Sequence, residues 1–175
     1  MKPLAAKQAM VAAGWAAALV ALAAIFWLGG RVFSGLANGA SESERLALVA
    51  RCLIGPGLAL LAGVATAGNL RFFSAEAIEG TRTPSQRALE ITLRYIQNTL
   101  EQTLLAAIAW AGLAVALPAP KLFLLPTLSV AFVVGRLTFW GGYLIHPMAR
   151  AFGMVVTLLP TVIAYVWLTW RLFAR

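Results

Sequence analysis

The feature that most limits how this chain can fold is a series of long apolar runs without charged side chains. The first, residues 9–28, carries no charge over about 20 positions, which is enough helix to cross a hydrocarbon core of about 30 Å. Of the 175 residues, 61% are hydrophobic and 11% are charged, whereas soluble domains have about 25% charged residues. The chain is therefore expected to be an integral membrane protein.

Five apolar runs predict an all-α membrane protein with no soluble domain. The predicted spans are residues 9–28, 46–70, 88–117, 122–144 and 151–170. The first run resembles a signal peptide, but its apolar part exceeds the usual length of about 7–15 residues. Ala37-Asn38-Gly39-Ala40 is also a poor cleavage site. We therefore predict that this helix is retained.

Proline and small residues predict how two of the spans are shaped. Pro56 should kink the second span, with neighbouring helices satisfying the backbone groups that it frees. Pro118-Ala119-Pro120-Lys121 predicts a tight turn, so the third and fourth spans should form an antiparallel hairpin. A ladder of small residues in the second span should let another helix approach closely; it consists of Gly55, Ala59, Gly63 and Ala67.

The basic residues of the loops predict that the N-terminus is cytoplasmic, and we separately expect the membrane to be a bacterial inner membrane. In that orientation, seven basic residues lie inside and five lie outside, a weak excess in the expected direction. Trp167 and Trp170 fit an aromatic belt at the membrane interface. The inner set is Lys2, Lys7, Arg71, Arg82, Arg87, Arg94 and Arg150, and the outer set is Arg31, Arg45, Lys121, Arg171 and Arg175.

The basic balance of the chain does not indicate nucleic-acid binding. Lysine and arginine number 14 against 6 acidic residues, for a net charge of +8, but they form no basic run of five or six. Cys52 is the only cysteine, which excludes an intrachain disulfide and a cysteine-based metal site. We interpret Cys52 as a small buried apolar residue.

A polar stripe opens the span predicted over residues 88–117. At 100° per residue, Arg94, Asn98 and Glu101 fall within about 40° of one another and share one helical face. An ionisable group at mid-bilayer costs about 2.5–3.5 kcal/mol, so such groups normally face a bundle interior or a water-filled cavity and carry a function. The stripe is therefore a candidate site.

A second polar set lies on the following span. Arg136 and Tyr143 are seven residues apart and therefore on one side of that helix. Glu101 lies about 10 Å of axial rise beyond Arg94, too far for a good pair, so Arg136 is its expected partner. Together these residues would line a pocket that opens toward the cytoplasm and holds a small ligand with carboxylates and an amine. The alternative is that they only lock the order of the helices.

The spacing of these residues resembles the signature of the MAPEG family, the membrane-associated proteins of eicosanoid and glutathione metabolism. The residues that carry the resemblance are Arg94-x-x-x-Asn98-x-x-Glu101, then Arg136, Tyr143 and Arg150. The resemblance covers about residues 45–173. It implies a four-helix transmembrane domain over residues 45–175, preceded in residues 1–44 by one additional transmembrane helix and a loop. It also implies a homotrimer that binds glutathione between subunits near the cytosolic face.

The resemblance also implies roles for single residues. Arg94, Asn98 and Glu101 would bind the carboxylate and amino groups of glutathione, with Arg136 and Tyr143 in the same site. Arg150 would be the catalytic residue, because a cation at a helix N-terminus favours the thiolate over a thiol whose ordinary pKa is about 8.5. Two positions depart from the family: Gln102 and Phe139 stand where well-studied members carry residues able to hydrogen-bond.

The implied function is that of a glutathione-dependent transferase or peroxidase acting on a lipophilic electrophile or hydroperoxide. Two other classes stay open on the residues alone. One is a non-catalytic membrane protein whose charged residues organise its helices. The other is a small transporter or channel with Arg94, Glu101 and Arg136 along its path, although five spans without an internal repeat argue against a secondary transporter.

Overall fold

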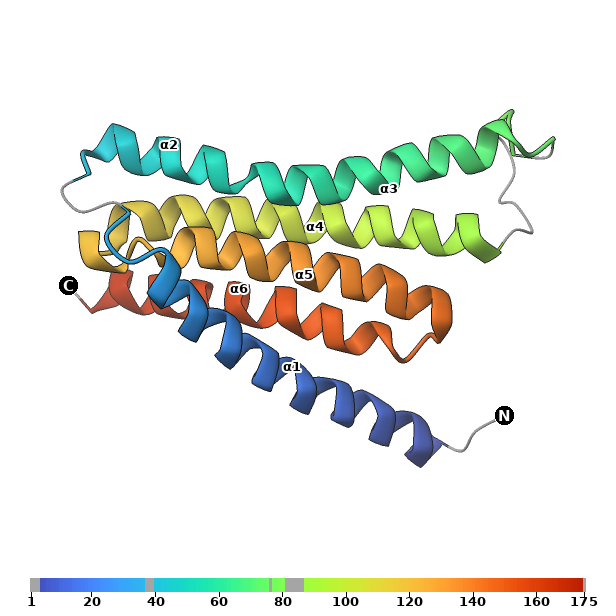
Figure 1. The fold of residues 1–175 in the computed structure, drawn as a ribbon, viewed down its shortest axis with the longest axis horizontal. Helices are drawn as coiled ribbons and strands as arrows, with labels where there is room; N and C mark the ends of the chain where they lie inside the picture. The colour runs from blue at the N-terminus through green and yellow to red at the C-terminus, as the bar shows by residue number, and fades with distance from the viewer. Residues whose placement is uncertain (1–3, 37–39, 76, 81–86, 175) are drawn as a thin grey trace.

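A computed structural model describes residues 4–36, 40–75, 77–80 and 87–174 of the chain. Within these residues every regular element is helical. Figure 1 shows the helices running along one common direction, apart from the first, which crosses the others obliquely. The elements are α1 (Leu4–Val32), α2 (Glu42–Cys52), α3 (Ile54–Phe72), α4 (Arg87–Ala116), the short 3-10 turn η1 (Ala119–Lys121), α5 (Leu124–Ile145) and α6 (Arg150–Phe173).

The predicted all-α membrane fold is confirmed. Five helical stretches in the described residues are long and apolar enough to span a membrane, and the shortest has 24 residues. At 1.5 Å per residue that is about 36 Å of helix, more than the hydrocarbon thickness of about 30 Å. The stretches are Leu4–Val32, Glu42–Phe72, Arg87–Ala116, Ala119–Ile145 and Arg150–Phe173.

Some residues used in the sequence argument lie outside the described residues. They are Lys2 and Arg82 from the inner basic set, Arg175 from the outer set, and Ala37, Asn38 and Gly39 of the rejected cleavage site.

The second span is divided into α2 and α3 at Leu53, three residues before the proline that was expected to kink it. Pro56 has no N–H, so the Cys52 carbonyl one turn earlier lacks its helical donor. Ser129 of α5 donates its hydroxyl to that carbonyl, with 2.6 Å between Oγ and O. A neighbouring helix thus satisfies the freed backbone group, as the sequence predicts.

The ladder of small residues lies where α3 meets its neighbours. A Cβ on Gly63 would come within 2.7 Å of Tyr95 Cε1 on α4, and a Cβ on Gly55 within 2.9 Å of Val133 Cγ2 on α5. Tyr95 also donates its hydroxyl to the Ala59 carbonyl across a distance of 2.8 Å. Small side chains therefore allow a close approach, and the exposed backbone becomes a hydrogen-bond partner.

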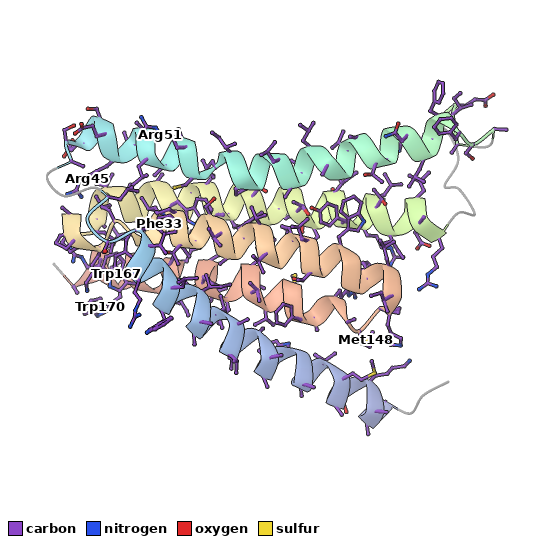
Figure 2. All side chains as sticks on the ribbon, viewed as in Figure 1. Phe33, Arg45, Arg51, Met148, Trp167 and Trp170 are labelled. Carbon is purple, nitrogen blue, oxygen red and sulfur yellow. The ribbon has the colours of Figure 1, made fainter. Side chains whose placement is uncertain are left out.

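The chain alternates between two ends of the bundle. Figure 2 labels Met148 at one end and Trp167 and Trp170 at the other, and these are called the Met148 end and the Trp167 end below. α4 and α6 begin at the Met148 end, near the N-terminal part of α1 (Figure 1). The turn η1 lies at the Trp167 end and joins α4 to α5 as the expected antiparallel hairpin.

The first helix is attached to the bundle through glycine contacts. α1 packs on α5 and α6. A Cβ on Gly14 would lie 3.5 Å from Ala151 Cβ on α6, and a Cβ on Gly29 would lie 2.6 Å from Thr127 Cγ2 on α5. These two positions tie α1 near each end of its path across the bundle.

Replacement of Ser129 by alanine should lower the free energy of unfolding by about 1–3 kcal/mol, because the Cys52 carbonyl loses its donor in a buried setting. The measurement is unfolding in mixed micelles of increasing denaturing-detergent content.

The control restores the missing backbone donor. Pro56→Ala returns an N–H to position 56, so the Pro56→Ala/Ser129→Ala double variant should lose less stability than the two single losses added together. Strict additivity would show that the Ser129 hydroxyl does not compensate for the proline.

Candidate functional site

A groove of about 720 Å³ at the Met148 end is lined by α1, α4, α5 and α6. It brings together five of the six residues expected to form a site. Arg94, Asn98 and Glu101 come from α4, Tyr143 from α5 and Arg150 from the first turn of α6. Residues from three separate spans thus face one shared space.

Arg94 is anchored at the edge of this groove. Its Nη1 donates to the Tyr143 hydroxyl at 3.1 Å, and its Nη2 pairs with Glu90 Oε1 at 2.6 Å. The ion pair with Glu90 is largely exposed, so it contributes little to stability. The bond to Tyr143 instead directs the guanidinium toward the groove.

Arg150 contacts the ring of the same tyrosine, whereas Arg94 contacts its hydroxyl. Its guanidinium carbon lies 4.6 Å from the centroid of the Tyr143 ring, within range of a cation–π interaction. The N-cap residue of α6 is Ala149, which makes no side-chain capping bond to the first turn. A cation and a helix N-terminus therefore coincide here, and both favour an anion.

The expected pair between Arg136 and Glu101 is not formed. Arg136 is fully buried, where its Nη1 donates to Asn98 Oδ1 at 2.7 Å and its Nη2 to Thr157 Oγ1 at 2.6 Å. Its guanidinium carbon also lies 4.7 Å from the centroid of the Phe139 ring. The prediction was wrong because it compared only the depths of Arg136 and Glu101 in the membrane. The rotation of α5 about its own axis directs Arg136 into the interior of the bundle and not toward Glu101.

The arginine fixes how Asn98 presents its amide. A guanidinium has donors only, so the Asn98 oxygen must face Arg136. The amide nitrogen, with its two N–H donors, is left for the groove that Asn98 also lines. Arg136 therefore holds Asn98 from inside the bundle and does not itself line the groove.

Glu101 keeps its carboxylate at the groove. Its Oε1 accepts a hydrogen bond of 2.8 Å from Gln97 Nε2, one turn earlier on the same exposed face of α4. Because Arg136 is buried between helices, the line of Arg94, Glu101 and Arg136 that a transport path would need is not formed among these residues.

Several site residues were missed by sequence reasoning. Val11 and Trp15 of α1 and Gln97 of α4 line the groove. Thr157 is seven residues after Arg150, so helical periodicity on α6 pointed to it, whereas nothing in a uniformly apolar first helix marked Val11 or Trp15.

Gln102, the first of the two positions that differ from the family pattern, does not line the groove. Gln102 is 4% exposed and is buried on α4. Phe139, the second departure, does line the groove.

Comparison with known proteins matches most of the chain but not its first helix. The MAPEG family profile matches residues 46–170, from within α2 into α6. Transmembrane protein 79 of Mus musculus is 30% identical over 132 residues, which is 75% of this chain and 33% of that protein. The chain thus spans about a third of the length of this curated relative. No solved structure matches.

Thr157→Val should lower the free energy of unfolding by about 1.5–3 kcal/mol, because the buried guanidinium loses a charge-assisted acceptor. The measurement is the same titration with denaturing detergent.

Thr161→Val is the matched control. Thr161 is equally buried one turn later, and its hydroxyl donates to a backbone carbonyl as that of Thr157 does, without an arginine partner. It should cost about 0.5–1 kcal/mol. Equal losses in both variants would mean that the contact to Arg136 adds nothing.

Proposed function

The chain belongs to the MAPEG family of membrane proteins, and from that premise we propose that it binds glutathione in the groove at the Met148 end. The bound thiol would act on a lipophilic electrophile or hydroperoxide that arrives from the bilayer. Proteins of this family generally bind glutathione.

The charge pattern of the groove carries the proposal. Glutathione has two carboxylates and one ammonium group, and the groove offers two guanidinium groups and one carboxylate. Arg94 and Arg150 both contact Tyr143, so two cations stand close to each other in the groove. Arg94 would take a carboxylate of glutathione, and Arg150 would lie at the sulfur. Glu101 stands on the same face of α4 as an acceptor for the ammonium. The volume of about 720 Å³ lies within the usual range of about 300–1,000 Å³ for small-ligand clefts.

Arg150 is the residue best placed to activate a thiol. Glutathione supplies a sulfur nucleophile, which is reactive as the thiolate and mostly protonated at neutral pH. The Arg150 guanidinium in the first turn of α6 would stabilise the negative charge on sulfur. Phe139 lines the groove nearby but has no group that donates a hydrogen bond. Stabilisation of the thiolate is therefore assigned to the Arg150 guanidinium.

Assembly and orientation are part of the same proposal. Glu101 lies about 21 Å along α4 from Arg87, and an exposed carboxylate facing lipid at such depth would be costly. A homotrimer that covers this face of α4 would remove that cost. We place the N-terminus and the Met148 end at the cytoplasmic face of a bacterial inner membrane, where glutathione has access.

A non-catalytic membrane protein is the second candidate. Phe139 favours it, because the ring takes a groove position at which a hydrogen-bonding side chain would help to hold the thiol. The Arg150 experiment below separates the two candidates.

Arg94→Ala and Glu101→Ala should each weaken glutathione binding at least tenfold, because each removes a charge-assisted contact to the ligand. Titration calorimetry on the protein in mild detergent measures the affinity, and the mass of the same samples reports the trimer.

Arg51→Ala is the matched control. Arg51 is an exposed guanidinium on α2 (Figure 2), and it does not line the groove. The Arg51→Ala variant should bind glutathione with the same affinity as the wild type. A folded Glu101→Ala trimer with unchanged affinity would return the stripe to a structural role, and a monomer that binds glutathione would remove the trimer from the proposal.

Arg150→Ala should leave most glutathione binding intact while removing the thiolate absorbance near neutral pH. A thiol pKa higher by about two units corresponds to about 2.7 kcal/mol, so the rate of conjugation to a reactive test electrophile should fall about a hundredfold. The measurement is a pH titration of thiolate absorbance with glutathione bound.

Arg150→Lys separates charge from geometry. Lysine keeps the positive charge but lacks the planar donor fork, so partial activity would identify charge as the main factor. Identical titrations in the wild type and both variants would remove Arg150 from the mechanism and favour the non-catalytic candidate.

A further inference from the structure

The turn between α5 and α6 ends immediately before Arg150, at the end of the molecule where Figure 2 labels Met148. Pro147 and Met148 of this turn line the groove, whereas His146 does not. His146 is nevertheless bonded to the turn through both its backbone and its side chain. Since α6 begins at Arg150, the shape of this turn sets where that guanidinium enters the groove.

Pro147 determines the course of the backbone through the turn. A residue that precedes proline is pushed toward extended geometry, and His146, with φ −151° and ψ 136°, ends α5 in that way. The His146 carbonyl accepts from the Ala149 N–H at 2.9 Å, which closes a four-residue turn with Pro147 in its second position. The His146 N–H donates to the Gly142 carbonyl, also at 2.9 Å. One residue is thus bonded both to the end of α5 and to the approach to α6.

The imidazole of His146 adds a third bond, and this bond depends on protonation. Its Nδ1 accepts from the Met148 N–H at 3.2 Å. A histidine nitrogen accepts only when it carries no proton, so the bond requires the neutral ring with its proton on Nε2. It runs from a side chain to the N–H two residues later, as in the turns that Asn and Asp side chains stabilise. A proton on Nδ1 would set two donors against each other and break the bond.

The charges at this end of the bundle would add to that effect. Cations outnumber carboxylates among the described groups that line the groove, pair with its residues or line the neighbouring hollow beside Met148. A proton on His146 would increase this positive excess, so repulsion would accompany the loss of the hydrogen bond. The charged and titratable groups of the set are Lys7 on α1, Glu90, Arg94 and Glu101 on α4, Tyr143 on α5 and Arg150 on α6.

We propose that His146 positions Arg150: its neutral imidazole holds the turn that places the guanidinium, and protonation of the ring releases that turn. Imidazole side chains gain a proton as the pH falls from about 8 to about 5. The groove therefore has its working shape at neutral and alkaline pH and loses it in acid. The effect on turnover rests on the proposed function. The state of the turn does not, since it is measured without glutathione.

Turnover of glutathione with a reactive test electrophile measures the catalytic consequence. At alkaline pH, His146→Ala should lower kcat about fivefold, as expected for one lost hydrogen bond, while the affinity for glutathione stays within about twofold. His146→Asn should restore kcat, because its side-chain oxygen accepts from the Met148 N–H as Nδ1 does. His146→Gln is the matched control: it carries the same amide one methylene farther out and should behave as His146→Ala does.

The pH profile separates the imidazole from the thiol, which titrates as well. Because the wild type and His146→Asn share Arg150, the ratio of their kcat values cancels the titration of the thiol. This ratio should fall about fivefold between about pH 8 and about pH 5.5. A ratio that does not change with pH would overturn the proposal, as would a His146→Gln variant as active as His146→Asn.

Nuclear magnetic resonance of the full chain, labelled with nitrogen-15 methionine, reports the turn itself. The chain has four methionines, and comparison with Met148→Leu identifies the Met148 amide signal. In the wild type this signal should shift as the imidazole titrates, whereas in His146→Asn it should not. The amide of Met154, within α6, is the internal control and should stay fixed in both.

A Met148 signal that titrates equally in the wild type and His146→Asn would refute the role of the imidazole. A Met148 signal that titrates only in the wild type, in a protein that binds no glutathione, would support the hold on the turn. That second result would count against the glutathione function alone.

Discussion

The buried guanidinium of Arg136 is the interaction on which the rest of the site depends. A charge in a low-dielectric interior must be compensated by well-aligned partners, and these are Asn98 on α4 and Thr157 on α6. Three helices are thereby held at one relative depth and rotation. The asparagine that reaches the groove is oriented by an arginine that does not reach it.

The same need for satisfied polar groups shapes the backbone of the bundle. Ser129 supplies the donor that Pro56 withholds from Cys52, and Tyr95 binds the carbonyl of Ala59. At the C-terminus of α4, Arg45 donates to the Leu117 carbonyl at 2.7 Å. In lipid no water replaces a missing partner, so side chains from neighbouring helices take that part.

Sequence reasoning succeeded where a property follows from counting along the chain. The length of apolar runs predicted the spans, and the angle of 100° per residue placed Arg94, Asn98 and Glu101 on one face. It failed where rotation between helices decides, as it did for Arg136 and Glu101. Sequence reasoning also did not predict where α1 packs, because a helix that is apolar all round has no preferred face. The position of α1 is set by close contacts such as that of Gly29 with Thr127.

The contacts of Tyr143 with two guanidinium groups have a thermodynamic consequence. Arg94 belongs to α4 and Arg150 to α6, so two like charges from different helices are held close together by one side chain. Glu90 offsets part of their mutual repulsion through its ion pair with Arg94, and the remainder works against the native arrangement. A ligand with one anionic group at Arg94 and another at Arg150 would replace that repulsion with attraction, and by mass action the native state would gain stability as the ligand concentration rises. Folding and occupancy of the proposed site would thus be linked through one phenol ring.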